Sequence, residues 1–149
     1  MDTYDKLDIA DEMLDAAITE FLNHQRFLPA LNLAAVAEEL YGKYIRISKG
    51  EDVLHENIKN AGLIAKHFGA EEIPHKDWKK VANTFKNEIK HFDSEADRFV
   101  EIDAEDEARL AIWDALQNHD KLNRAESEEI AAFTAYAHEY AKKRKHIDS

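Results

Sequence analysis

Apolar side chains recur at steps of three and four residues along most of this chain, the spacing of a helix with one buried face. The first such stripe predicts a helix from about Tyr4 to Asn23. Its apolar positions are Leu7, Ala10, Leu14, Ala17, Ile18 and Phe21. The intervening positions are mostly polar, so we expect this helix to lie against a core and to show its other side to water.

A second stripe predicts a helix with Pro29 in its first turn, where the missing N–H of proline costs nothing. The segment Ser48-Lys49-Gly50 is expected to end it. Its predicted buried side consists of Leu31, Ala34, Ala35, Leu40, Tyr44 and Ile45. The small residues in this stripe favour a close approach by a neighbouring helix.

Four more helices are predicted further along the chain. They run over about 51–68, from Pro74 to about residue 92, from a cap at Asp103 to about residue 118, and over about 124–145. The segment 93–102 has no sustained period and is the longest irregular stretch. Within it, Phe99 and Val100 are expected to dock onto the core.

Composition supports an all-α class. The chain has 149 residues, of which 44% are hydrophobic, with four Gly and two Pro. We expect one domain over residues 1–149, built as an antiparallel bundle of four long helices plus one or two shorter ones. The absence of cysteine excludes disulfides and thiolate chemistry. Without a signal peptide or an apolar stretch of about 20 residues, a cytoplasmic protein that does not enter membranes is expected.

Known arrangements for metals and cofactors do not fit this sequence. A di-iron bundle needs two Glu-x-x-His repeats, and only Glu88 with His91 has that spacing inside a predicted helix. The other match, Glu72 with His75, is interrupted by Pro74. Phosphate-binding glycine loops, dinucleotide fingerprints and serine elbows are also missing. We therefore expect no metal and no cofactor.

Charge singles out the helix that starts at Pro74. The whole chain has a net charge of −11, which opposes broad, nonspecific binding to nucleic acid. Residues 75–91 nevertheless carry five lysines against two acids. In a helix, Asn87 and His91 lie one turn apart, and Lys86 edges the same groove. Lys86 would hold a phosphate, Asn87 would position a hydroxyl, and His91 would act as general acid or base.

The second helix offers two acidic residues that would support this site. Glu38 and Glu39 follow directly after the small residues of that helix. One reading places one of them next to the basic helix, paired with Lys86 or orienting His91. The alternative is that one glutamate is solvated and the other makes an ordinary ion pair between helices.

Three stretches of the chain resemble the HEPN superfamily of small all-α domains. They are the helix segment Ala30–Lys43, the hexapeptide Lys86-Asn87-Glu88-Ile89-Lys90-His91, which is similar to the Arg-polar-x-x-x-His signature, and the helix segment Glu107–Asn118. The resemblance implies a homodimer whose two signatures line one cleft for RNA or a nucleotide. It also implies metal-independent endoribonuclease chemistry of a toxin or defence type, with an antitoxin as a protein partner.

The signature departs from the family pattern at one position. Lys86 stands where the family has arginine, and lysine lacks the planar fork that grips a phosphate through two hydrogen bonds. Catalysis is therefore expected to be weakened or absent. The alternative to an HEPN-like RNase or binding module is a helical bundle with a structural or protein-interaction role and no enzymatic function.

Overall fold

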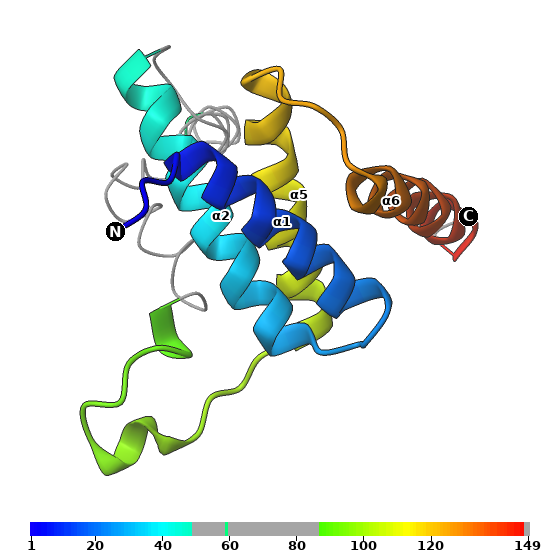
Figure 1. The fold of residues 1–149 in the computed structure, drawn as a ribbon. Helices are drawn as coiled ribbons and strands as arrows, with labels where there is room; N and C mark the ends of the chain where they lie inside the picture. Colours follow the sequence, from blue (N-terminus) through cyan, green and yellow to red (C-terminus); the bar gives the residue numbers. More distant parts are fainter. Residues whose placement is uncertain (49–58, 60–86, 148–149) are drawn as a thin grey trace.

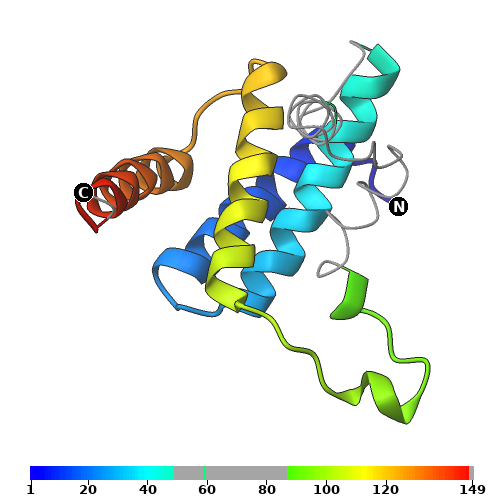
Figure 2. The same cartoon turned by 180° about the vertical axis from the view of Figure 1, so that it is seen from behind.

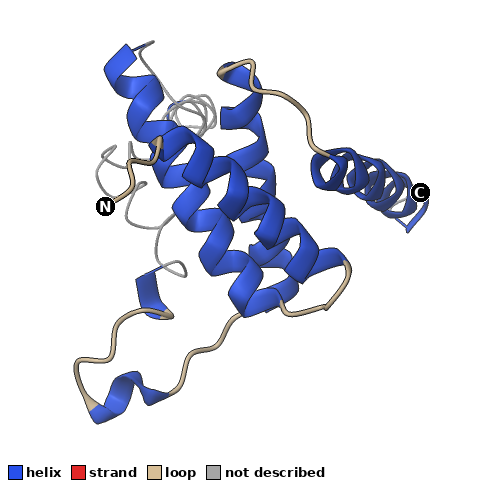
Figure 3. Cartoon of the chain, viewed as in Figure 1, coloured by secondary structure: helices blue, strands red, loops and turns tan. Residues whose placement is uncertain are grey.

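The computed structural model describes residues 1–48, 59 and 87–147 of the chain. Within these ranges the regular structure is entirely helical, and the predicted all-α class is confirmed (Figures 1 and 3). The elements are α1 (Lys6–Leu22), α2 (Phe27–Ser48), the short 3-10 helix η1 (Glu95–Arg98), α5 (Ala104–Lys121) and α6 (Glu128–Ile147). The helices predicted over 51–68 and from Pro74 onward lie almost wholly outside the described residues.

Local capping defines where several of these helices begin. Asp5 accepts a hydrogen bond from the backbone N–H of Leu7 at 2.8 Å, and Asp103 accepts one from Asp106 at 3.1 Å. Ser127 Oγ accepts one from the N–H of Ile130 at 3.1 Å. Each cap satisfies a backbone donor that the first helical turn leaves without a partner. The cap predicted at Asp103 is thus present.

The core lies where α2 packs against both α1 and α5 (Figures 1 and 2). Alanine dominates these contacts, since eight alanines of the core are buried: Ala10, Ala17, Ala30, Ala34, Ala37, Ala108, Ala111 and Ala115. Small side chains let helix backbones approach closely. Leu14, Leu31 and Ile112 fill the remaining space and are completely buried. The predicted stripe of the first helix is confirmed at five of its positions, all but the partly buried Leu7.

The last helix is attached differently from the other three. It packs mainly on α1, and its anchor is Phe133, whose ring meets that of Phe21 edge-on with centroids 5.9 Å apart. In Figures 1 and 2 the ribbon of α6 is separated from that of α5, and the side chain of Arg109 in α5 reaches the ring of Tyr140 in α6. Ile130 and Phe133 are its buried apolar residues, as their predicted positions on one face require.

Three expectations from the sequence were wrong in detail. Tyr44 is 45% exposed, and Tyr41 takes the buried position instead. Phe99 and Val100 do not dock onto the core but are 83% and 41% exposed. The last helix begins at Glu128, because residues 122–127 form a loop that carries Arg124 back toward α1.

Candidate functional site

The segment that carries the predicted signature is described only from Asn87 onward. Lys86 lies outside the described residues. Asn87 and Glu88 are helical, Ile89 and Lys90 form a turn, and His91 follows it in non-helical backbone. The predicted helix to residue 92 therefore ends earlier, and Asn87 and His91 do not share a helical face. Both side chains are exposed.

A tight turn after His91 accounts for this early helix end. The Asp97 carboxylate accepts hydrogen bonds from the backbone N–H of Asp93 at 3.1 Å and of Ser94 at 2.7 Å. It also accepts one from the Ser94 hydroxyl at 3.0 Å. These donors, led by the Ser94 hydroxyl, hold the pKa of Asp97 below its usual value. Asp97 thus directs the chain into η1 instead of a longer helix.

His91 opens onto a cavity of about 500 Å³. Its described lining contains four carboxylates and three apolar side chains besides His91: Glu88, Asp93, Asp97 and Glu101, with Ala96, Phe99 and Val100. An imidazole among carboxylates can exchange protons with a bound group. The same carboxylates attract cations and repel phosphates unless cationic groups offset them.

The two predicted supporting glutamates lie in different environments on α2. Glu38 is 6% exposed, whereas Glu39 is exposed and pairs with Lys43 at 2.5 Å. The hydrogen bond from Lys43 lowers the pKa of Glu39, and the positive charge of Lys90 contributes to the shift. Lys90 therefore lies near enough to Glu39 to act on it. The predicted pairing of Glu38 or Glu39 with Lys86 involves a residue that lies outside the described ones.

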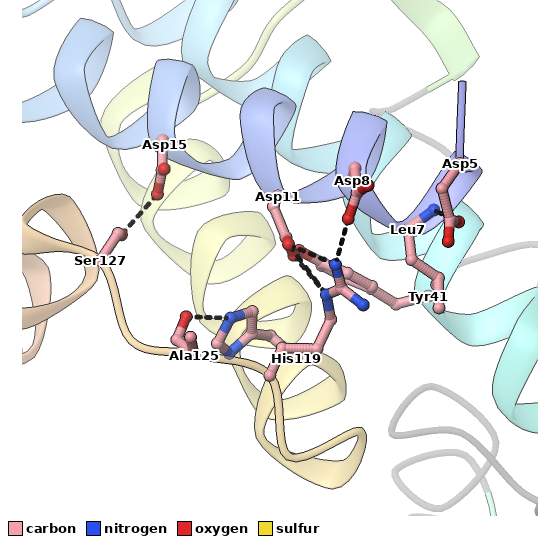
Figure 4. Close-up of polar contacts among 10 residues, drawn as sticks. Asp5, Leu7, Asp8, Asp11, Asp15, Tyr41, His119, Ala125 and Ser127 are labelled. Carbon is pink, nitrogen blue, oxygen red and sulfur yellow. Dashed lines mark hydrogen bonds and ion pairs between the residues drawn. The ribbon is translucent and has the colours of Figure 1, made fainter. Parts of the chain in front are cut away.

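A second polar cluster, which the sequence did not predict, joins α1, α2 and the α5–α6 loop (Figure 4). Asp11 is its centre. The guanidinium of Arg124 donates to both carboxylate oxygens of Asp11, with Nε at 2.8 and 2.9 Å and Nη2 at 2.6 Å. Nη2 also donates to Asp8 at 2.7 Å, and the hydroxyl of Tyr41 donates to Asp11 at 2.6 Å.

These contacts shift the pKa values of Asp11 and of Tyr41. Burial raises the pKa of the Asp11 carboxyl, but the hydrogen bonds from Arg124 and Tyr41 outweigh burial and leave it below its usual value. Burial and the hydrogen bond to Asp11 hold the pKa of Tyr41 well above its usual range. Asp11 is therefore a carboxylate and Tyr41 a neutral phenol at neutral pH. We call this set (Asp8, Asp11, Tyr41 and Arg124) the Asp11 cluster.

The turn after α5 brings Arg124 into this position. Asn123 adopts a left-handed conformation with φ of 51°, which asparagine tolerates better than most residues. His119, 1% exposed, holds the next part of the loop, because its Nε2 donates to the carbonyl oxygen of Ala125 at 3.2 Å. Its ring meets that of Tyr41 edge-on at 5.9 Å between centroids. Loop and cluster thus form one packed unit.

Ser127 connects the start of α6 to the same face of α1. Its hydroxyl donates to Asp15 Oδ1 at 2.6 Å while its oxygen caps the helix. Burial raises the pKa of the Asp15 carboxyl, and the hydrogen bond from Ser127 opposes that shift in part. Asp8, Asp11 and Asp15 recur at helical spacing beside the apolar stripe of α1, and this was the signal available in the sequence.

The Asp11 cluster and the His91 cavity suit different roles. In the cluster, Tyr41 is buried and the charged groups are bonded to one another, so it acts as a cross-link between helices. The His91 cavity is open and holds an exposed imidazole. Among the residues that the structure describes, no group of three or more His, Asp or Glu side chains is placed to hold a metal ion.

Comparisons with protein-family models, with curated proteins and with solved structures found no significant match to this chain. Within the described parts of the chain, no helix is both long and apolar enough to cross a bilayer. The His91 cavity is therefore the feature from which we infer a function.

Proposed function

We propose that this chain is an HEPN-like helical module that binds RNA or a nucleotide at the His91 cavity. In this proposal residues 1–149 form one cytoplasmic domain, an antiparallel bundle of four long helices with one or two shorter ones, and two copies form a homodimer. His91 is the acid/base group, Asn87 positions a ribose hydroxyl and Lys86 holds a phosphate. Cleavage is slow or absent, so that binding is the main activity.

The open cavity beside an exposed His91 is the observation that supports this proposal. Its volume of about 500 Å³ lies within the range of small-molecule sites, roughly 300–1,000 Å³. Phe99 on its wall is 83% exposed. An accessible aromatic ring can stack on a base without selecting its sequence. Imidazole and aromatic groups at one opening suit a nucleotide, with the base on Phe99 and the ribose next to His91.

Weak catalysis follows from the charges around His91. Four carboxylates line the cavity, and they disfavour the negative charge that builds up on a phosphate during cleavage. Lysine at position 86 stabilises such charge less well than the arginine of the family signature. Both features reduce the rate of a metal-independent cleavage while still allowing a bound ligand.

Binding is tested by fluorescence anisotropy with labelled single-stranded RNA and by thermal shift with nucleotides. We expect binding that weakens with salt. We also expect His91→Ala to weaken it at least tenfold, because it removes the polar group at the cavity mouth. His24→Ala is the matched control, since His24 is also exposed but lies at the end of α1. Equal affinity of the His91→Ala and native proteins, or no binding of RNA or nucleotide, would contradict the proposal.

Cleavage is tested separately with end-labelled RNA in the presence of EDTA. We expect the native protein to form products with 2′,3′-cyclic phosphate ends slowly or not at all. The His91→Ala variant is expected to form them no faster than the native protein. Lys86→Arg restores the residue of the family signature. It is expected to leave binding similar and to raise any cleavage rate.

A protein-interaction module without enzymatic function is the second candidate. The four carboxylates of the His91 cavity favour it, because they complement a cationic segment of a protein partner such as an antitoxin. A lysine- and arginine-rich peptide distinguishes the two. Tight binding of that peptide with no binding of RNA supports the second candidate, and the reverse result supports the first.

A further inference from the structure

An apolar groove separates α5 from α6. It has a volume of about 480 Å³ and is lined by Leu110 and Trp113 of α5, by Phe133, Ala137 and Ala141 of α6, and by a few polar residues. Leu110 is 44% exposed and Trp113 is 37% exposed. Helix α6 packs on α1, where Phe133 is its anchor, and the groove lies between α6 and α5.

Basic residues border the end of this groove. Arg109 lies over the ring of Tyr140 at 4.2 Å from its centroid, and Lys142 and Lys143 are exposed on α6 just beyond. The sequence continues with Arg144 and Lys145. Two acids belong to this region, Asp106 paired with Arg109 and Glu139 paired with Lys142. With these two pairs formed, the excess of positive charge at the end of α6 comes from Lys143 and, in the sequence, from Arg144 and Lys145.

The segment 92–101 has the complementary properties. It exposes three apolar side chains, with Phe92 69%, Phe99 83% and Val100 41% accessible. They stand among Asp93, Glu95, Asp97 and Glu101, with Arg98 as the basic residue of the segment, 5.4 Å from the centre of the Phe99 ring. Hydrogen bonds from Asp93 and Ser94 to Asp97 close a turn at the start of this segment. Exposed aromatic rings on an ordered acidic segment are typical of a binding surface.

We propose that the acidic segment 92–101 of one copy docks into the α5–α6 groove of a second copy, with Phe99 as its anchor. The apolar ring fits the apolar groove, and the acids around Phe99 face the lysines at the end of α6. The segment 92–101 and helix α6 lie on opposite sides of one molecule in both Figures 1 and 2. The contact is therefore made between copies, and it is heterologous, joining two different patches.

Docking would also change the His91 cavity. Phe99, Val100, Asp97 and Glu101 line that cavity, so the second copy would bring Lys142 and Lys143 next to these carboxylates. The added positive charge offsets the negative lining and favours a phosphate there, whereas a base can stack on Phe99 only in a copy whose segment 92–101 is not docked. This consequence rests on the proposed function, whereas the docking itself does not.

Sedimentation equilibrium without RNA tests the docking. We expect association of the native chain that weakens with salt, because charges contribute to it. Phe99→Ser and Trp113→Glu are each expected to raise the dissociation constant at least tenfold. Leu110→Glu is a second groove variant should Trp113→Glu fail to fold, as judged by circular dichroism. Tyr4→Ser is the control, since Tyr4 is an equally exposed aromatic residue outside both surfaces.

Mixing the two variants tests whether segment 92–101 of one copy contacts the α5–α6 groove of another. The Phe99→Ser chain keeps an intact groove and the Trp113→Glu chain keeps an intact segment 92–101, so the mixture is expected to associate through one intact contact. A native chain that stays monomeric at all concentrations would overturn the docking, as would a groove variant that disrupts association while Phe99→Ser does not. RNA binding by such a monomer would leave the proposed binding at the His91 cavity standing and would contradict only the proposed homodimer.

Discussion

Asp11→Ala removes the carboxylate on which the Asp11 cluster is built, and we expect it to be among the most destabilising polar substitutions in this chain. Asp11 accepts from Arg124 and from the Tyr41 hydroxyl. After the substitution the Tyr41 oxygen, in a completely buried residue, loses its acceptor. Arg124 keeps only its contact with Asp8. The helix itself is not weakened, because alanine is the best helix former.

The expected magnitude follows from the burial of each group. A buried hydroxyl without a partner costs about 1–3 kcal/mol. The Asp11–Arg124 pair is partly screened, with side chains 34% and 21% exposed, so its loss adds about 1 kcal/mol. The sum is about 2–4 kcal/mol, which corresponds to a fall in melting temperature of roughly 4–16 °C for a chain of this size.

Urea unfolding followed by circular dichroism measures this loss, with a constant m-value as the check on two-state behaviour. Asp8→Ala is the matched control. Asp8 sits one turn before Asp11 and contacts the same guanidinium, but its side chain is 73% exposed. We expect that control to cost about 0.5 kcal/mol or less.

A double-mutant cycle tests whether Asp11 and Arg124 stabilise the fold as one cross-link. If Asp11 and Arg124 form one cross-link, Asp11→Ala and Arg124→Ala together cost less than the sum of the two, with a coupling energy of about 1 kcal/mol or more. Additive costs would refute the cross-link, as would a small effect of Asp11→Ala equal to that of Asp8→Ala.

Three further predictions concern the same face of α1 and its contact with α6. The lowered pKa of Asp11 gives stability that is present at neutral pH and lost as pH falls through that pKa, whereas the raised pKa of Asp15 destabilises the fold only when Asp15 is ionised. As the pH is lowered, the free energy of unfolding is therefore expected to fall more steeply in Asp15→Asn than in the native protein, and less steeply in Asp11→Asn. The same slope for both variants would contradict the two pKa shifts. Ser127→Ala loses the cap of α6 and the bond to Asp15 and is expected to cost about 1–2 kcal/mol in urea unfolding. Phe133→Ala empties the anchor of α6 and is expected to cost about 3–5 kcal/mol by the same measurement, while Tyr44→Ala, at an exposed position, is expected to cost far less.

Much of the fold could be predicted because burial imposes its period on the sequence. The stripe of α1 and the cap at Asp103 depend on neighbours within one or two turns, so spacing alone identifies them. The same reasoning missed Tyr41, although Ala34, Ala37, Tyr41 and Ile45 share the helical spacing. Tyrosine is compatible with either face of a helix, and the choice between Tyr41 and Tyr44 depends on which side of α2 meets α1 and α5.

The candidate site was less accessible to sequence reasoning. The charge pattern singled out residues 86–91, and the structure leaves His91 exposed next to a cavity. The lining of that cavity could not be predicted, since Asp97 turns the chain through bonds to Asp93 and Ser94. The helix was predicted to continue to residue 92 from the spacing of apolar residues alone. That spacing does not reveal that the Asp97 carboxylate accepts hydrogen bonds from the backbone N–H groups of Asp93 and Ser94.

The order of residues along the chain was enough to predict helical structure, the course of α1, α2 and α5, and an uneven distribution of charge. These properties are local, since each depends on the spacing of side chains along a few turns. The contact of Arg124 with Asp11, 113 residues apart in the chain, and the groove between α5 and α6 became visible only in the folded molecule. Such contacts depend on how helices cross and rotate against one another, and helical periodicity carries no information about either.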